Sequence, residues 1–203
     1  MSILLVRHGE TAFNAARILQ TPDIPLSARG IAQAERLAAR LAKLGVAAIV
    51  SSDYARAHMT AERVRAATGA GIELWPELRE RNFGALRGRA YAELGFDPFA
   101  LDYAPPEGES WDVFHARTAR AWPRVLARAR QLDGNLAVIS HGLVVRAFAE
   151  REVGLGGLEP PLSWPNASLT IVASAPPPAL EVLNCVEHLA DFDSPPSASL
   201  GRA

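Results

Sequence analysis

The chain of 203 residues lacks several features that would tie it to a particular environment or partner. Cys185 is its only cysteine, so an intrachain disulfide is excluded and nothing favours secretion. Its 21 basic and 22 acidic side chains give a net charge of −1 and are mixed along the chain, which argues against nucleic-acid or membrane-surface partners. No apolar run is long enough to cross a bilayer, and the first one is interrupted at Arg7, so neither a membrane span nor a signal peptide is expected. We therefore expect a cytoplasmic protein.

Short apolar runs alternate along the chain with segments of helical periodicity. Strands are expected at residues 3–6, 46–50, 72–74 and 136–140, and two late strands, at 168–173 and 180–184, are expected to pair as a hairpin-like edge. Helices are expected from Ser27 to about 44, after Ser51–Asp53 to about 68, from Ser110 to about 132 and over 143–153, with a short one near 90–94. Pro123 is expected to kink or divide the third of these. The alternation predicts an α/β sandwich with a largely parallel sheet.

No repeat or linker divides the chain. We therefore expect one domain over residues 1–192. Residues 193–203 are rich in Ser, Pro and Ala and are expected to form a disordered tail.

Two of the expected strands are followed by a histidine and a glycine. Arg7-His8-Gly9 follows the first strand, and His141-Gly142 follows the strand at 136–140. Because the carboxyl ends of parallel strands share one edge of a sheet, these segments and Ser51–Arg56 are expected to meet in one cleft. An arginine beside a histidine suits an anionic, phosphorylated ligand.

A phosphomonoesterase that works without a metal needs a nucleophile, positive charge on the transferred oxygens, and an acid for the leaving alcohol. His8 or His141 could attack phosphorus as a neutral imidazole, and Arg7 and Arg56 could hold the phosphoryl oxygens. Glu80, in an irregular segment, is the candidate acid. The backbone N–H groups of residues 142–143, at the start of a helix, would add a further anion site.

The order of these motifs resembles the histidine phosphatase superfamily, the phosphoglycerate-mutase-like clan. Arg7-His8-Gly9-Glu10-Thr11 with Asn14 resembles the family's opening signature. Further blocks that resemble the family lie at residues 25–34, 51–61, 78–88 and 140–142, in that order. The resemblance implies a three-layer sandwich with a largely parallel central sheet and helices on both faces.

The resemblance also implies roles for individual residues. His8 would be the phosphorylated nucleophile, Glu80 the proton donor, and Arg7, Arg56 and His141 the groups that bind the phosphoryl group. Expected substrate-binding residues are Asn14, Gln20, Thr21, Arg81, Gly142 and Leu143. Neither a metal nor an organic cofactor is expected, the expected partner is a small phosphorylated substrate, and the oligomeric state is left open, a homodimer included.

The resemblance extends to two kinds of enzyme. Cofactor-dependent phosphoglycerate mutases resemble the chain around Glu80, but they have a longer insertion after it that contains an adjacent arginine pair. Here Arg117 and Arg120 are not adjacent, and Gly108-Glu109-Ser110 resembles the phosphatase-type block. The sequence therefore favours a phosphatase acting through a phosphohistidine on His8, with a mutase as the alternative. A non-catalytic module that binds a phosphorylated ligand is a third hypothesis, which the presence of both His8 and Glu80 disfavours.

Overall fold

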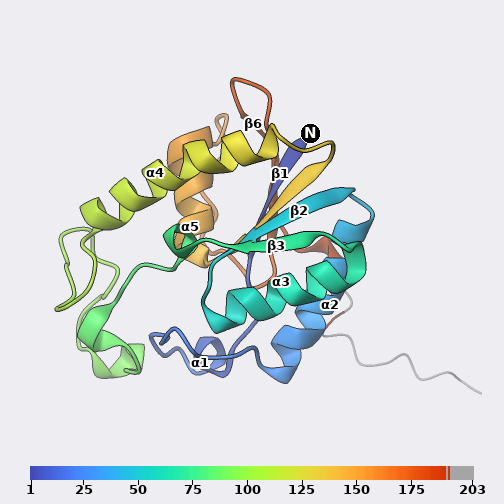
Figure 1. The fold of residues 1–203 in the computed structure, drawn as a ribbon. Coiled ribbons are helices and arrows are strands. Elements are labelled where there is room, and N and C mark those ends of the chain that lie inside the picture. The colour runs from blue at the N-terminus through green and yellow to red at the C-terminus, as the bar shows by residue number, and fades with distance from the viewer. Residues whose placement is uncertain (191, 193–203) are drawn as a thin grey trace, which may run out of the picture.

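The computed structural model describes residues 1–190 and 192 (Figure 1). The strands are β1 (Ser2–Arg7), β2 (Val46–Ser51), β3 (Gly71–Leu74), β4 (Asn135–Ser140), β5 (Leu169–Ala173) and β6 (Ala179–Cys185). The α-helices are α1 (Ala12–Ala15), α2 (Ala28–Ala42), α3 (Ala55–Thr68), α4 (Trp111–Ala129) and α5 (Gly142–Ala147). Short 3₁₀ turns are η1 (Pro76–Leu78), η2 (Gly84–Leu86), η3 (Tyr91–Glu93) and η5 (Glu187–Leu189), and a π-helical turn, η4 (Phe148–Val153), continues α5. The tail predicted at 193–203 lies outside the described residues.

The strands form one sheet in the order β3-β2-β4-β1-β5-β6. The first four run parallel to one another, and β5 pairs antiparallel with both β1 and β6. The late pair is therefore the antiparallel edge that the sequence predicted. The largely parallel sheet is confirmed.

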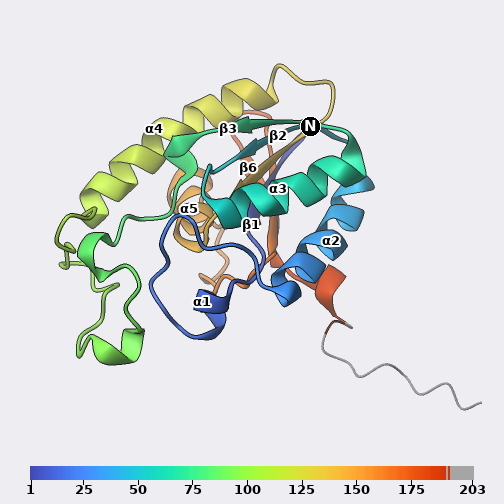
Figure 2. The same ribbon diagram turned by 60° about the horizontal axis from the view of Figure 1, so that its bottom comes forward.

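Helices cover both faces of the sheet because its central strands are apolar on both sides. In β1, Ile3 and Leu5 pack in one hydrophobic cluster with residues of α4 and α5, whereas Leu4 and Val6 pack in a second cluster with residues of α2 and α3. Figure 2 shows α2 and α3 on one side of the strands and α4 on the other. The predicted three-layer α/β sandwich is confirmed.

Two local predictions differ from the structure. Ser51–Asp53 do not cap the following helix: α3 begins at Ala55, Tyr54 is its N-cap residue, and no side chain there accepts a capping hydrogen bond. Pro123 does not divide α4, which runs unbroken from Trp111 to Ala129. Since Pro123 and Ala119 both lie on the exposed side, the carbonyl that loses its partner to the proline can be hydrated.

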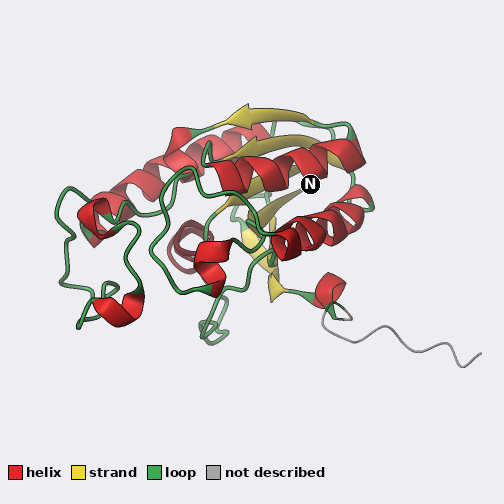
Figure 3. Ribbon diagram, turned by 90° about the horizontal axis from the view of Figure 1, so that it is seen from below, coloured by secondary structure: helices red, strands yellow, loops and turns green. Residues whose placement is uncertain are grey.

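Loops with short helical turns surround the end of the sheet where β1, β2 and β4 finish (Figure 3). The strand-like pairing continues one residue into these loops, because His8 N donates to Ser140 O at 2.9 Å. Two chain segments touch here at glycines: a Cβ on Gly9 would lie 2.4 Å from Gly30 O. The backbone after His8 is therefore held directly against the start of α2. Within the described residues, no helix is long and apolar enough to cross a membrane.

Candidate active site

His8 follows β1 and has one ring nitrogen fixed by the backbone. Its Nδ1 lies 2.6 Å from Gly9 O, which can only accept, so Nδ1 carries the proton and Nε2 keeps its lone pair. The side chain is 2% exposed. Burial, and then the positive charges of Arg56 and Arg7, hold the pKa of His8 well below its ordinary value. His8 is therefore a neutral imidazole whose lone pair is on Nε2.

Two buried guanidinium groups accompany His8. Arg56, in the first turn of α3, donates from Nε to His8 Nε2 at 3.2 Å and from Nη1 to Thr21 O at 2.9 Å. Arg7, at the end of β1, donates from Nη1 to Trp164 O, and its buried Nε has no hydrogen-bond partner among the described residues. Burial lowers the pKa of both groups, that of Arg56 to about 10, so both remain charged at neutral pH. The arginines supply fixed positive charge beside the nucleophile.

His141 follows β4 and lies against His8, with the ring centroids 5.1 Å apart at 65°. Its Nε2 is 2.9 Å from Ser52 Oγ. If Ser52 Oγ, which accepts from Tyr54 N, donates its hydroxyl proton to Nε2, the ring proton of His141 is on Nδ1. That Nδ1 is buried and has no partner in the part of the chain that the structure describes. Burial and the charge of Arg56 hold the pKa of His141 well below its ordinary value.

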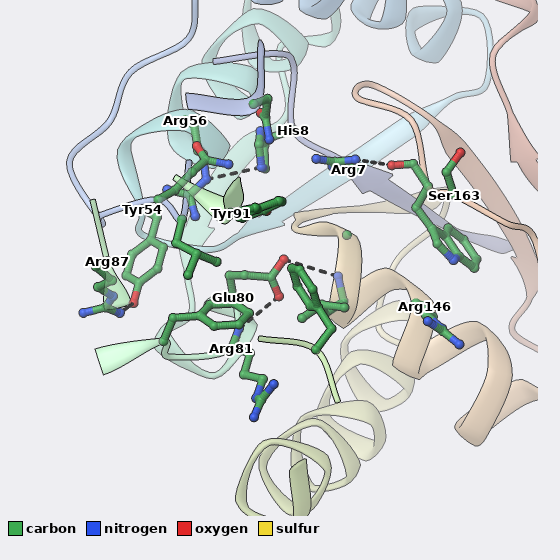
Figure 4. A pocket seen from close by; sticks show the side chains of 18 of the residues that line it. Arg7, His8, Tyr54, Arg56, Glu80, Arg81, Arg87, Tyr91, Arg146 and Ser163 are labelled. Carbon is green, nitrogen blue, oxygen red and sulfur yellow. Dashed lines mark hydrogen bonds between the residues drawn. The ribbon is translucent and has the colours of Figure 1, made fainter. Parts of the chain in front are cut away.

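Glu80 lies across the cavity from His8 (Figure 4). Its carboxyl accepts from Arg81 N at 2.9 Å and from Leu143 N at 3.3 Å. Burial raises its pKa, and these N–H groups together with Arg56 and Arg7 oppose the rise. The carboxyl group therefore stays protonated to a higher pH than an ordinary glutamate, which suits a proton donor.

Three predicted substrate-binding residues lie on or near the loop after α1, and two of their side chains reach the cavity. Asn14 and Gln20 line the cavity, and both accept from Thr11 Oγ, at 3.1 and 2.8 Å. Thr21 does not line the cavity: its hydroxyl donates to Asp23, and only its carbonyl contributes, as the acceptor for Arg56. The sequence could not show this division because it depends on how the loop folds back on α3.

The other three lie opposite. Arg81 borders the cavity, but its guanidinium points away from His8 and donates to the carbonyls of Glu109, Pro98 and Tyr103. Gly142 and Leu143 also line the cavity. However, the N–H of Leu143 is bonded to Glu80, so this helix start holds the acid. The predicted ligand contacts of these residues remain predictions.

The cavity has a volume of about 460 Å³. Besides the predicted residues, it is lined by residues that the sequence motifs did not single out for substrate contact, namely Leu19, Tyr54, Phe83, Arg87, Tyr91, Phe99, Arg146, Leu162, Ser163 and Trp164. Most belong to the irregular segments at 83–99 and 162–164, which have no periodicity to read. Over residues 1–190 and 192, no group of three or more His, Cys, Asp or Glu side chains could hold a metal ion.

Comparison with known proteins agrees with this geometry. The sequence model of the histidine phosphatase superfamily (branch 1) matches residues 3–179. A protein of Proteus mirabilis named "Probable phosphoglycerate mutase GpmB" is 32% identical over 209 residues, which cover 95% of this chain and 96% of that protein.

Solved structures of both kinds of enzyme also match. A mycobacterial glucosyl-3-phosphoglycerate phosphatase, solved with VO3, has a TM-score of 0.78 at 26% identity, over 91% of this chain and 99% of its own. A phosphoglycerate mutase from Thermus thermophilus has a TM-score of 0.66 at 34% identity, over 90% of this chain and 97% of its own. Because the family model covers most of the chain, this protein belongs to the histidine phosphatase superfamily, branch 1.

Proposed function

We propose that this protein is a phosphomonoesterase that works without a metal and hydrolyses a small phosphorylated metabolite through a phosphohistidine on His8. One observation carries the proposal. The Nε2 lone pair of a neutral His8 lies beside two buried arginines and opposite a carboxyl group whose pKa is raised. Nucleophile, charge and acid are thus on the sides of one cavity where in-line phosphoryl transfer needs them.

In the first step, His8 Nε2 forms a bond to phosphorus and the bond from phosphorus to the ester oxygen breaks. The electron pair of that bond leaves with the oxygen, which takes the proton of Glu80 and departs as the alcohol. Arg7, Arg56 and the Nδ1–H of His141 are the donors available for the phosphoryl oxygens.

In the second step, the Glu80 carboxylate takes a proton from a water molecule, whose oxygen attacks the phosphorus of phospho-His8. The bond from phosphorus to Nε2 breaks, and its electron pair returns to the ring. The products are inorganic phosphate, a neutral His8 and a protonated Glu80, so the enzyme is restored.

A phosphatase is favoured over a mutase by the arginines on the leaving-group side. A phosphoglycerate carboxylate needs a cation there. Arg81 has its guanidinium bonded to three backbone carbonyls and turned away from the cavity. Of the other two arginines that line this side, Arg146 pairs with Glu150 and Arg87 donates to the Tyr54 hydroxyl. Arg117 is also committed, because it forms an ion pair with Glu109. The mutase remains the second candidate on account of the relatives that carry that name.

The test compares wild type with His8→Ala on a panel of small phosphate esters, with and without a chelator. We expect chelator-resistant hydrolysis in wild type and its loss in His8→Ala. His58→Ala is the matched control, because His58 is a half-exposed histidine of α3 that pairs with Glu62 outside the cavity. Full activity of His8→Ala would overturn the proposal, and phosphate binding without turnover of any ester would revive the binding module.

A second assay on the same preparation separates the two enzymes. It measures interconversion of phosphoglycerates after priming with a bisphosphorylated sugar acid. Interconversion faster than release of phosphate would establish the mutase instead.

A further inference from the structure

The side of the cavity that would receive the leaving group is mainly apolar. It is built by Leu19 from the loop after α1, by Phe83, Tyr91 and Phe99 from the segment between η1 and α4, and by Leu143 from α5. Leu19, Phe83 and the partly buried Tyr91, Phe99 and Leu143 belong to one hydrophobic cluster, and Leu143 also packs against the cluster formed with α4 and α5. This wall is a packed surface and not a loose loop.

Tyr91 is part of this wall, and in the view of Figure 4 its ring lies between His8 and Glu80. The edge of the Phe99 ring packs against it at 5.6 Å and 83°, and the Arg17 guanidinium lies 5.8 Å from its centroid. Its backbone N–H donates to Arg17 O at 2.9 Å. Burial, and then the nearby Glu80, raise the pKa of the Tyr91 hydroxyl, so the side chain is neutral. Tyr91 therefore presents a fixed, uncharged ring to a leaving group.

Each cation on this side donates to a neighbouring acceptor, although Arg87 donates a single N–H group to a neutral hydroxyl. Arg146 donates to both carboxylate oxygens of Glu150, at 2.9 and 3.0 Å, and Arg87 donates to the Tyr54 hydroxyl at 2.9 Å. Arg81 is bonded to backbone carbonyls. An anionic leaving group would have to compete with these bonds, whereas an apolar one would leave them intact.

The mouth of the cavity is apolar as well. Leu162 lines it and is fully exposed. A second cavity of about 240 Å³ shares Phe99, Leu143 and Arg146 with the first and is bordered by Leu101, which is 85% exposed. Exposed apolar side chains beside a cavity are typical of a surface that a ligand covers.

We propose that the leaving-group side of this cavity binds an aromatic or other apolar group, and that Tyr91 and Phe99 select it. The substrates are thus phosphate monoesters of apolar alcohols or phenols. This inference rests on the proposed function, because it concerns the group that departs when His8 is phosphorylated.

The test must separate binding from chemical reactivity. We would compare 3-phenylpropyl phosphate with glycerol 3-phosphate, since both release a primary alcohol and differ mainly in the apolar group. We expect kcat/KM of wild type to be at least tenfold higher for the phenylpropyl ester. Equal values, or a preference for glycerol 3-phosphate with activity still dependent on His8, would overturn the inference and leave the phosphatase standing. No hydrolysis of either ester, or of any other in the panel, would instead count against the proposed function.

Variants of the wall residues then test whether the wall selects the apolar leaving group. Tyr91→Ser should reduce the ratio of the two kcat/KM values by about tenfold, whereas Tyr91→Phe, which keeps the ring, should leave it within about threefold. Tyr103→Ser is the control, because Tyr103 packs in the same cluster without lining the cavity. An unchanged ratio in Tyr91→Ser, or an equal loss in Tyr103→Ser, would exclude Tyr91 as the selecting residue.

A separate observation concerns Arg117 of α4, which lies behind Glu80. Its Nη1 donates to Glu77 O and to Arg79 O, both at 2.8 Å, and its Nη2 reaches Glu80 O at 3.4 Å. Its Nε and Nη2 also form a bidentate pair with Glu109 at 2.8 and 2.7 Å. One guanidinium therefore holds three carbonyls of the segment that ends at Glu80.

The pair is anchored at both ends. Glu109 Oε2 also accepts from Asn82 N at 2.9 Å, so the carboxylate holds the chain just after Glu80 as Arg117 holds it just before. Both side chains are largely buried. The geometry assigns Arg117 as a positioning residue that sets where the Glu80 carboxyl lies, without touching the cavity itself.

A positioning role predicts a loss that depends on the leaving group. Arg117→Gln should lower kcat by ten- to a hundredfold for 3-phenylpropyl phosphate, which needs a proton donor, and by less than threefold for 4-nitrophenyl phosphate, which does not. The pH above which the rate falls, which reflects loss of the proton of Glu80, should shift as well. Arg124→Gln is the control, since Arg124 lies on the same helix and pairs with the Glu77 side chain at the surface. If Arg117→Gln does not fold, Arg117→Lys serves in its place. An equal loss on both esters would overturn the assignment.

Discussion

Replacing Glu80 with glutamine removes the proposed proton donor and keeps the shape of the side chain. The amide oxygen can still accept from one of the two N–H groups of Arg81 and Leu143, so one of the hydrogen bonds that hold the side chain is kept and the other is lost. What disappears is the proton that the leaving oxygen needs. A positioned general acid contributes about 10²–10⁴ in rate. We therefore expect kcat of Glu80→Gln to fall by about that factor on 3-phenylpropyl phosphate and by less than tenfold on 4-nitrophenyl phosphate.

The dependence of activity on pH gives a second, independent test of Glu80 as the proton donor. Glu80 must be protonated to act, and its pKa is raised, so wild-type activity falls as pH rises through a value above that of an ordinary glutamate. His8 must be neutral, and its pKa is lowered, so activity falls at low pH only well below the ordinary histidine value. Glu80→Gln should lose the fall in activity at high pH and keep the fall at low pH. Ionisation of the substrate is common to both proteins and cancels in the comparison.

The assay is steady-state release of phosphate from both esters over a range of pH, for wild type and Glu80→Gln. The reasoning is refuted if the variant loses the same factor on both esters, or if its pH profile has the shape of the wild type. Either result would mean that Glu80 binds or shapes the site and does not donate the proton.

Three further substitutions test other parts of the molecule. Arg56→Lys keeps the charge but loses the simultaneous hydrogen bonds to His8 and to Thr21 O. In steady-state kinetics kcat should fall by about 10²–10³, and thermal melting should show an unchanged melting temperature. Gly30→Ala would place a Cβ 1.9 Å from Glu10 O, so the free energy of unfolding should fall by about 1–3 kcal/mol in a denaturant titration; unchanged stability would show that α2 can shift at no cost. Phe114→Ala empties a fully buried position of α4 and should lower the free energy of unfolding by about 3–5 kcal/mol. A loss below about 1 kcal/mol would contradict the packing.

The features that could be predicted from the sequence are those that depend on local pattern. The runs at 3–6 and 136–140 are apolar at nearly every position because β1 and β4 are buried on both faces, and such runs in alternation with helices predict a parallel sheet. The meeting of His8 and His141 then follows from the rule that parallel strands end on one edge. Ser27 and Ser110 do cap α2 and α4, because an N-cap depends only on the next three residues.

Contacts between distant segments could not be predicted from local pattern. Arg81 reads as a free cation next to an acid, and its true partners lie 17 to 28 residues further on. Tyr91 stands in a segment without periodicity, and its place opposite His8 depends on the packing of its loop against residues 17–19. Thr21 reads as a loop hydroxyl near the ligand, yet it donates to Asp23 two residues away and leaves only its carbonyl for the site. In each case the sequence shows the type of residue but does not show which group it bonds to.

The electrostatics of the site imply that an anion should stabilise the whole fold. Arg7 and Arg56 are both buried and charged, and Glu80, whose pKa is raised, offsets their charge less than an ordinary carboxylate would. Arg7 lines the cavity, and its Nε has no partner among the described residues and would find one in a phosphate oxygen. At phosphate concentrations about 100 times Kd, binding to the native state adds about 2.7 kcal/mol, which for a domain of this size raises Tm by roughly 5–10 °C. Thermal melts in phosphate and in chloride of equal ionic strength test this, and Arg56→Gln should lose most of the difference. If that variant keeps the full shift, the stabilisation comes from exclusion of phosphate from the surface and the site does not hold the uncompensated charge inferred here.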